Sequence, residues 1–293
     1  MVRLILIAAL ALGNLLVWSF AFPDRTLSVS FLNIGQGDAI LIESPTGVQL
    51  LVDGGPDTSV LRELGTQLPF FDRSIDVVVE THPDQDHIAG LVHVFKRYDV
   101  GTFLEPGIVN GTPVARALSA AISAEEGVHH ILARRGMRLI LGGGAYADIL
   151  FPDRDVSGVE TNTGSVVMRV VYGNTSLLLT GDSPQSVEKY LVSLNQTCAI
   201  PGNSTSCARL GCCTLGADVL KAGHHGSKTS SSEEFVAVVN PQYVVYSRGC
   251  ENRYGHPAPE VVALFEKFNI PAFDTCKDGT VTFLSDGNTL TKR

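Results

Sequence analysis

The stretch Thr81-His82-Pro83-Asp84-Gln85-Asp86-His87 decides the interpretation of this chain. It follows Ile75-Asp76-Val77-Val78-Val79, which is typical of a buried strand, so it lies on a loop between a strand end and a helix start. Imidazole and carboxylate groups in this arrangement suit Zn²⁺, Mn²⁺ or Fe²⁺. Helix capping would explain one aspartate, but not all four side chains. The spacing therefore predicts a metal site.

Two later clusters follow short apolar strands in the same way. One is Leu177-Leu178-Leu179-Thr180-Gly181-Asp182, and the other is Lys221-Ala222-Gly223-His224-His225-Gly226-Ser227-Lys228. Ligands tend to bind at the carboxyl ends of strands in α/β sheets, which is where both clusters would lie. Alone, Gly-Asp is an ordinary turn and a surface histidine pair means little. The clusters matter because they occur together with the first stretch.

The rest of the chain alternates between segments typical of strands and of helices, which favours layers of helix and sheet. We expect helices over about residues 58–68, 88–98, 113–126, 184–194, 231–239 and 259–268. Ser231 and Glu234 have the spacing of a capping box at the start of the fifth helix. Lys277-Asp278-Gly279 is interpreted as the turn of a hairpin between the last strands.

Together, the three clusters resemble the metallo-β-lactamase superfamily, in which H-x-[HD]-x-D-H is followed by Gly-Asp and by a late histidine. From about Leu27 to Phe283, the chain is also similar to the extracellular hydrolase domain of ComEC-type DNA-uptake channel proteins. Six motifs carry this similarity in order: Phe31-Leu32-Asn33-Ile34-Gly35-Gln36-Gly37-Asp38-Ala39, Asp53-Gly54-Gly55, Thr81 to Gly90, Thr180-Gly181-Asp182, His224 to Ser231, and Asn252-Arg253-Tyr254-Gly255-His256-Pro257.

The resemblance implies an α/β fold, a four-layer αβ/βα sandwich, with the metals at the edge between its two halves. It implies one or two divalent ions, Zn or Mn, as the cofactor. The first ion would be held by His82 and Asp84, the second by Asp86, His87 and His225, and both would be bridged by Asp182. His225 is preferred to His224 because the superfamily's late histidine is followed by a small residue.

Catalytic and supporting roles follow from the same resemblance. Asp86, His224 and His256 are the catalytic candidates. His224 would lie beside the metal ligands or contact a substrate phosphate. His256 would act as a general acid, contact the substrate or have a structural role. Asp53 would orient a metal ligand, unless it only belongs to a tight turn.

A phosphate site is expected just before the helix that starts at Ser231. Ser227, Lys228 and Thr229 could bind a phosphate oxygen through backbone N–H groups and one cation. Lys228 fits a solvated surface charge equally well.

One position departs from the superfamily pattern. Many members carry a further histidine before the bridging aspartate, where this chain has Asn162 within Thr161-Asn162-Thr163-Gly164-Ser165. Asn162 is a poor substitute ligand, which suggests weaker binding of the first ion. His129 and His130 could replace the missing histidine, but a surface pair near a helix end is the plainer interpretation.

The ligand set favours hydrolysis of phosphate esters. It is rich in oxygen donors, and a bound divalent ion lowers the pKa of water to about 7. The leading hypothesis is a phosphodiesterase or nuclease acting on DNA or on a small phosphate ester. One alternative is a hydrolase of a lactone or other carbonyl ester. Another is a non-catalytic binding or scaffold module of the cell envelope with a vestigial metal site.

Charge limits the range of partners. With 22 basic and 30 acidic residues, the formal net charge is 22 − 30 = −8, which disfavours an obligate nucleic-acid scaffold. In ComEC-type proteins the hydrolase domain follows a multi-helix channel that has no counterpart in these 293 residues. A separate channel protein is therefore one expected partner.

The N-terminus predicts export. Residues 4–22 hold no charge and follow Arg3, which is typical of a signal peptide or of a single membrane anchor. Either interpretation makes residues 1–22 a targeting segment and residues 27–293 an extracytoplasmic domain, secreted or anchored to the membrane.

The cysteines agree with this compartment. All six lie between Cys198 and Cys276, which fits disulfides formed under oxidising conditions. Four belong to a polar, Gly-rich segment at about residues 195–216, interpreted as a surface insertion. It would close on itself with one or two disulfides, or bind a second zinc ion. In the resembled fold Cys250 and Cys276 lie near neighbouring strand ends, so the resemblance implies that they pair.

Overall fold

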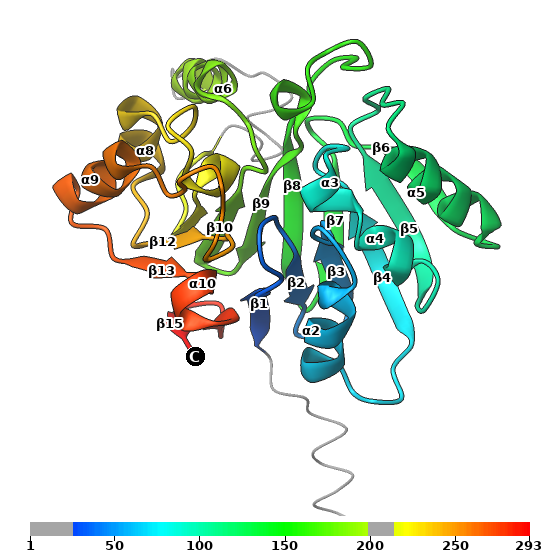
Figure 1. Cartoon of the computed structure of the whole chain (residues 1–293). Helices are drawn as coiled ribbons and strands as arrows, with labels where there is room; N and C mark the ends of the chain where they lie inside the picture. Colours follow the sequence, from blue (N-terminus) through cyan, green and yellow to red (C-terminus); the bar gives the residue numbers. More distant parts are fainter. Residues whose placement is uncertain (1–25, 199–213) are drawn as a thin grey trace, which may run out of the picture.

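The computed structural model describes residues 26–198 and 214–293, and two β-sheets form its centre (Figure 1). The strands of the first sheet are β1 (Leu27–Phe31), β2 (Ile40–Glu43), β3 (Gln49–Val52), β4 (Ser74–Val79), β5 (Asp99–Glu105), β6 (His129–Leu132), β14 (Val281–Ser285) and β15 (Leu290–Lys292). Their order is β15-β14-β1-β2-β3-β4-β5-β6. The pairs from β14 to β3 are antiparallel, and those from β3 to β6 are parallel.

The second sheet comes from the later part of the chain. Its strands are β7 (Arg138–Gly142), β8 (Ala145–Phe151), β9 (Val167–Tyr172), β10 (Thr175–Leu179), β11 (Val219–Lys221), β12 (Tyr243–Tyr246) and β13 (Ala272–Asp274). Their order is β13-β12-β11-β10-β9-β8-β7, and β10 to β13 run parallel. Parallel strands bring their carboxyl ends to one edge, where loops can form a binding site.

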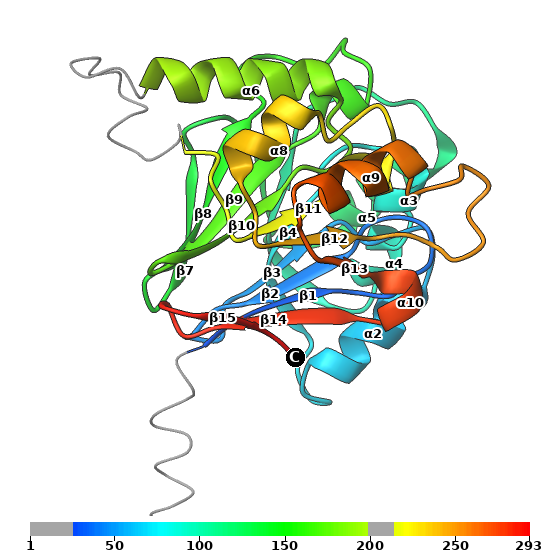
Figure 2. The ribbon, with the colours of Figure 1, turned by 90° about the vertical axis from the view of Figure 1, so that its left-hand side faces the viewer.

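Helices cover the outer face of each sheet (Figure 2). Those on the first sheet are α2 (Ser59–Gln67), α3 (Gln85–Ile88), α4 (Leu91–Val94) and α5 (Pro113–Ala124). Those on the second are α6 (Gln185–Cys198), α8 (Glu233–Val239) and α9 (Pro259–Lys267). The helices pack against alternate residues of the strands, and the other alternate residues fill the space between the sheets. This arrangement confirms the predicted four-layer αβ/βα sandwich.

Three predictions of local structure are wrong. The helix expected over residues 88–98 is divided into α3 and α4 at Gly90, where the chain passes very close to another backbone segment. The fifth helix begins at Glu233 rather than at Ser231, and no side chain caps it. Residues Thr275–Asp278 form a helix, α10, and the strands on either side of it belong to different sheets, so no hairpin exists there.

Two predicted segments lie wholly or mainly outside the described residues. They are the N-terminal targeting segment, 1–22, and the Cys-rich insertion, of which residues 199–213 are not described. The first residues assigned to the insertion instead continue α6, which extends to Cys198. Within residues 26–198 and 214–293, no helix combines the length and apolar character needed to cross a bilayer. A disulfide joins Cys250 to Cys276, which confirms the predicted pair.

Candidate metal centre

The loop after β4 positions the first group of candidate ligands. His82 lies on this loop, Asp84 occupies the N-cap position of α3, and Asp86 and His87 lie within that short helix. The Asp84 side chain accepts no capping hydrogen bond. Helix capping therefore does not account for this carboxylate, which lies with its Oδ2 3.7 Å from Nε2 of His82.

Hydrogen bonds hold three imidazole rings so that each presents Nε2 to the same space. Nδ1 of His87 donates to Asp53 at 2.8 Å, and Nδ1 of His225 donates to the Ser247 carbonyl oxygen at 2.8 Å. Nδ1 of His82 lies 3.0 Å from the hydroxyl of Thr81, which itself donates to Asp53 and so can only accept from the ring. All three Nε2 atoms are buried and have no hydrogen-bond partner among the described residues.

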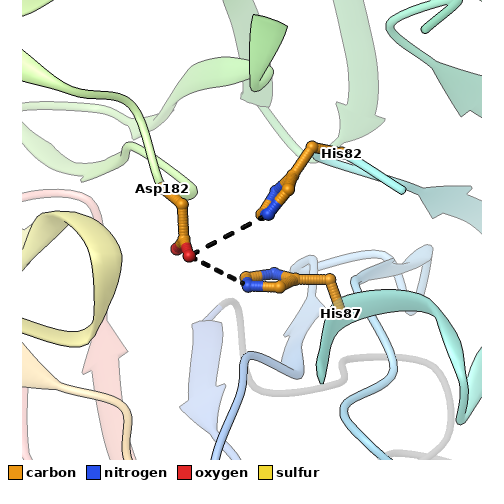
Figure 3. Close-up of side chains that lie close together, drawn as sticks. All are labelled: His82, His87 and Asp182. Carbon is orange, nitrogen blue, oxygen red and sulfur yellow. Dashed lines mark ion pairs between the residues drawn. The ribbon is translucent and has the colours of Figure 1, made fainter. Parts of the chain in front are cut away.

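The Asp182 carboxylate lies close to all three nitrogens, and Figure 3 shows it beside those of His82 and His87. Its Oδ2 is 3.3 Å from Nε2 of His87, 3.4 Å from that of His225 and 3.9 Å from that of His82. Asp86 completes the group, with Oδ2 3.5 Å from Nε2 of His225. The structure thus brings together all six residues predicted as ligands, from the ends of β4, β10 and β11. Buried, unpartnered imidazole nitrogens around carboxylates fit a transition-metal ion.

The two sheets therefore supply complementary halves of the centre. Figure 3 shows Asp182 approaching from the segment after β10, opposite His82 and His87, which follow β4. His225 lies in the turn Gly223–Gly226, where both it and His224 adopt positive φ angles of 56° and 50°. Such a backbone is unfavourable for non-glycine residues and is concentrated at functional sites. Here it directs the His225 ring into the centre.

The charges of the centre shift the pKa values in a consistent pattern. Burial alone would lower the pKa of His87 and His225, but the carboxylate of Asp182, with Asp53 beside one ring and Asp38 beside the other, raises both well above their usual range. Burial and the neighbouring His87 lower the pKa of His82 instead. The metal-free site thus holds protons on two of the three rings at neutral pH, and an incoming cation must displace them.

The carboxylates respond in the opposite sense. Burial would raise the pKa of Asp182, but the charges of His225, His87 and Lys221 outweigh it and lower the pKa well below its usual range. Burial would also raise the pKa of Asp86. The hydrogen bond and charge of His225 and the charge of His87 outweigh burial and lower this pKa to about 2. Both carboxylates are therefore ionised at neutral pH, as metal ligands must be.

Two charged residues of the centre were not predicted as site residues. Lys221, at the end of β11, is fully buried, and its Nζ lies 2.6 Å from Oδ2 of Asp38 and 3.5 Å from Oδ1 of Asp182. Nζ also donates to the Gly181 carbonyl oxygen at 2.9 Å. Both residues belong to motifs that are quoted above, but the residue types alone do not predict an ion pair between them. Lys221 supplies a permanent positive charge between two buried carboxylates.

Asp53 supports the centre from behind, where it was predicted to orient a ligand. It has a positive φ of 59° and accepts hydrogen bonds from the Thr81 backbone N–H at 2.8 Å, the Thr81 hydroxyl at 2.7 Å and the His87 ring. It therefore contacts both the loop and a candidate ligand. The backbone of Gly37 also packs closely against that of Asp86. Only glycine fits there, because an added Cβ would lie 1.9 Å from the Asp86 carbonyl oxygen.

The predicted catalytic histidines lie beside this group. Nε2 of His224 is 3.6 Å from Oδ2 of Asp182, and its Nδ1 lies 3.3 Å from the hydroxyl of Thr229. The ring of His256 packs edge-on against His224 and is stacked against Tyr254. Burial and the charges of the neighbouring histidines lower the pKa of His256 to about 4, so its ring is neutral at pH 7. A neutral ring can donate a hydrogen bond but is a poor source of a proton.

The residues of the predicted phosphate site differ in their exposure and in their contacts. The hydroxyl oxygens of Ser227 and Thr229 are 3.0 Å apart near His224; Ser227 is buried, whereas Lys228 and Thr229 are exposed. The backbone N–H groups of Ser231 and Ser232, which a helix N-terminus would offer to phosphate, instead donate to the buried carboxylate of Glu188. This competing contact explains why the predicted capping box does not form.

Neither Asn162 nor the histidine pair makes a hydrogen bond or ion pair to the group of six among the described residues, although Thr161, next to Asn162, interacts with the side chain of Asp84. Asn162 begins a short 3₁₀ turn, and its buried Oδ1 has no hydrogen-bond partner among the described residues. His129 and His130 are exposed, as expected of a surface pair, but they belong to β6 rather than to a helix end. Nε2 of His130 pairs with Oε1 of Glu105 at 2.7 Å.

Comparisons with known proteins agree with this geometry. Residues 32–249 match the family model described as "Metallo-beta-lactamase superfamily". "ComE operon protein 3" of Bacillus subtilis (strain 168) is 30% identical over 273 residues, which cover 87% of this chain and 32% of that protein. "Competence protein ComA" of Neisseria gonorrhoeae is 30% identical over 267 residues, which cover 90% of this chain and 33% of that protein. The chain spans about a third of the length of these relatives, and their similarity confirms the resemblance to ComEC-type proteins.

Solved structures show the same fold at low sequence identity. YhfI from Bacillus subtilis, a metallo-beta-lactamase fold protein, has a TM-score of 0.52 and 13% identity, covering 86% of this chain and 96% of that one. CmlA from Streptomyces venezuelae, a diiron beta-hydroxylase, has a TM-score of 0.54 and 16% identity, covering 86% of this chain and 53% of that one. With the family model matched over most of its length, the chain belongs to the metallo-β-lactamase superfamily.

Proposed function

We propose that this protein is a metal-dependent phosphodiesterase. The observation that carries the proposal is the convergence of three buried, unpartnered imidazole nitrogens on the carboxylate of Asp182. Without a bound cation, Nε2 of His82 has no partner, and His87 and His225 hold protons that a cation would displace. A bound divalent cation would accept all three lone pairs and neutralise the carboxylates.

The composition of the ligand set favours an oxygen-rich substrate. Three carboxylates accompany three imidazoles, a harder set than histidines alone, which suits Mn²⁺ as well as Zn²⁺. In the assignment that we propose, His82 and Asp84 hold one ion, Asp86, His87 and His225 hold the other, and Asp182 bridges them. Ions of this kind activate water at neutral pH and stabilise charge on phosphoryl oxygens.

The surrounding residues would bind and orient the substrate. His224 lies at the mouth of the centre, where its ring can donate to a phosphate oxygen, and the hydroxyls of Ser227 and Thr229 are close to it. A pocket of about 410 Å³ is lined by Asp86, Glu251 and Arg253 among other residues. This pocket offers space for a substituent of the phosphodiester. The overall charge of −8 favours a small or weakly held substrate over tightly bound duplex DNA.

The test is a hydrolysis screen of the purified chain with Mn²⁺ or Zn²⁺. Similarity to competence proteins makes single-stranded DNA a suitable macromolecular substrate, beside bis-p-nitrophenyl phosphate, a lactone and a β-lactam. We expect hydrolysis of the phosphodiesters, and its loss in Asp182→Asn but not in Asp155→Asn, which changes an exposed aspartate outside the centre. Hydrolysis of the lactone or β-lactam alone would replace this proposal with a carbonyl hydrolase. Failure to bind either metal would favour a scaffold with a vestigial site.

We also infer that the domain is exported. The Cys250–Cys276 disulfide supports this inference because disulfides persist mainly in oxidising compartments. The apolar residues 4–22 supply the targeting signal, whether cleaved or kept as an anchor. Fractionation of cells followed by mass determination of the mature chain tests both points. Recovery of the full-length reduced protein from the cytosol would contradict export.

A further inference from the structure

A second pocket lies between α5 and the first sheet, and none of the six candidate metal ligands lines it. Its volume is about 290 Å³, near the lower limit for small-molecule sites. Apolar side chains of α3, β5 and α5 form much of its wall: Ile88, Phe103, Leu118 and Ile122. Pro83 of the metal loop also lines it, so the pocket adjoins the loop from outside the metal centre.

Glu80 is the unusual residue of this pocket. It directly follows β4, is only 5% exposed, and its backbone N–H donates to the Leu104 carbonyl oxygen at 2.9 Å. No N–H or O–H group of the described residues donates to its carboxylate. Val78 packs among the helices and Val79 between the sheets, so alternation along the strand directs Glu80 toward the helices, into the pocket. The carboxylate is therefore open to the pocket but largely shielded from bulk water, and a cationic ligand in the pocket would compensate its charge.

The remaining polar groups give the pocket a negative character. Glu105 lines it as well, with its carboxylate paired to the exposed ring of His130. No lysine or arginine is among the lining residues.

The geometry does not favour a metal ion as the cationic ligand. Among the described residues, every group of three side chains close enough to share a metal ion consists of aspartates and histidines of the centre. Glu80 belongs to none of these groups. Of the two lining carboxylates, that of Glu105 is already paired with His130, so the free carboxylate of Glu80 beside the apolar wall instead matches a single charged group on an apolar stem. The aromatic ring of Phe103 adds a surface on which such a stem can pack.

We propose that this pocket binds a small organic cation, a primary ammonium or amidinium group on a short apolar stem, with Glu80 as its counter-ion. The stem packs against Phe103 and Leu118, and the bound molecule contacts Pro83 and Ile88 on either side of the candidate ligands. The pocket is thus a ligand site separate from the hydrolytic centre, and the proposal does not depend on the proposed phosphodiesterase activity.

Calorimetric titration of the full chain with benzylamine tests this proposal, with benzyl alcohol as an uncharged probe of similar shape. We expect saturable benzylamine binding, and binding at least tenfold weaker for the alcohol and for Glu80→Gln. Glu43→Gln, which changes a half-buried carboxylate outside the pocket, should bind benzylamine as the wild type does. Ser119→Phe, at an exposed position of α5 that lines the pocket, should block it without loss of thermal stability.

Several results would overturn the proposal. Absence of saturable benzylamine binding to the wild type at millimolar concentration is one. Equal binding of benzylamine and benzyl alcohol is another, because it would remove the role of charge. Unchanged binding in folded Glu80→Gln, or in Ser119→Phe, would place the amine elsewhere on the protein.

Discussion

Replacing Lys221 by methionine tests how the metal-free centre is stabilised. Nζ of Lys221 makes a 2.6 Å ion pair with Asp38, a 3.5 Å pair with Asp182 and a 2.9 Å hydrogen bond to a carbonyl oxygen. Methionine keeps the length of the side chain and removes its charge. The two carboxylates are 1% and 3% exposed, so water cannot replace the lost cation without opening the site.

The expected loss is large because one partner of a buried pair is removed while the other remains. Breaking such a pair costs about 3–5 kcal/mol in the free energy of unfolding. For a domain of roughly this size, each kcal/mol shifts the melting temperature by about 2–4 °C, so we expect a decrease of about 6–20 °C. Saturating Mn²⁺ or Zn²⁺ should reduce the loss, since the added cation compensates Asp182.

The assay is urea unfolding in the presence of a chelator, followed by circular dichroism. Lys267→Met is the matched control, because Nζ of Lys267 also lies 2.6 Å from a carboxylate, that of Glu233, but both side chains are about 60% exposed. Such a surface pair contributes about 0–1 kcal/mol. Adding Asp38→Asn to Lys221→Met should recover part of the lost stability. A loss below about 1 kcal/mol for Lys221→Met, equal to that of the control, would refute the reasoning.

Three further results are expected. Metal uptake should release protons from His87 and His225, so the apparent affinity should rise with pH, as calorimetry in buffers of different ionisation enthalpy would reveal. These raised pKa values stabilise the metal-free fold at low pH, and its free energy of unfolding should fall as pH rises through them; a rise would contradict the assignment. Asp53→Asn should weaken metal binding by about 10–100-fold in a competition titration at a temperature where the variant is folded, and unchanged affinity would exclude its orienting role. Gly90→Ala should destabilise the fold, because the new Cβ would lie 1.8 Å from a backbone oxygen, whereas Gly65→Ala in α2, with no atom within 4 Å, should stabilise it by about 0.5–1 kcal/mol; equal effects in chemical unfolding would contradict this comparison.

The ligands on the loop after β4 were predictable because local geometry determines their placement. A strand end, a tight loop and the first turn of α3 bring His82, Asp84, Asp86 and His87 to one side within a single short segment. Asp182 and His225 required more information, since only the ordered family pattern relates them to that loop. The structure adds the reason that they meet, which is that β4, β10 and β11 end at the same edge.

Contacts between segments that are far apart in the sequence could not be predicted from local patterns. Lys221 of the second sheet meets Asp38 of the first, and neither residue type indicates a buried pair. The capping box at Ser231 failed for a similar reason, because Glu188 of α6 takes the backbone N–H groups that a local cap would use. Glu80 shows the same limit, since nothing in an apolar strand followed by a glutamate predicts an isolated carboxylate within a pocket.

The direction of β1 determines how an attached N-terminal segment would present the protein. β1 runs antiparallel to β2, β2 antiparallel to β3, and β3 parallel to β4, so β1 and β4 point the same way. The chain therefore enters β1 at the end of the sheet opposite the centre, about a strand length, or roughly 17–20 Å, away. An anchor attached before β1 would therefore join the domain at the end of the sheet far from the candidate metal centre.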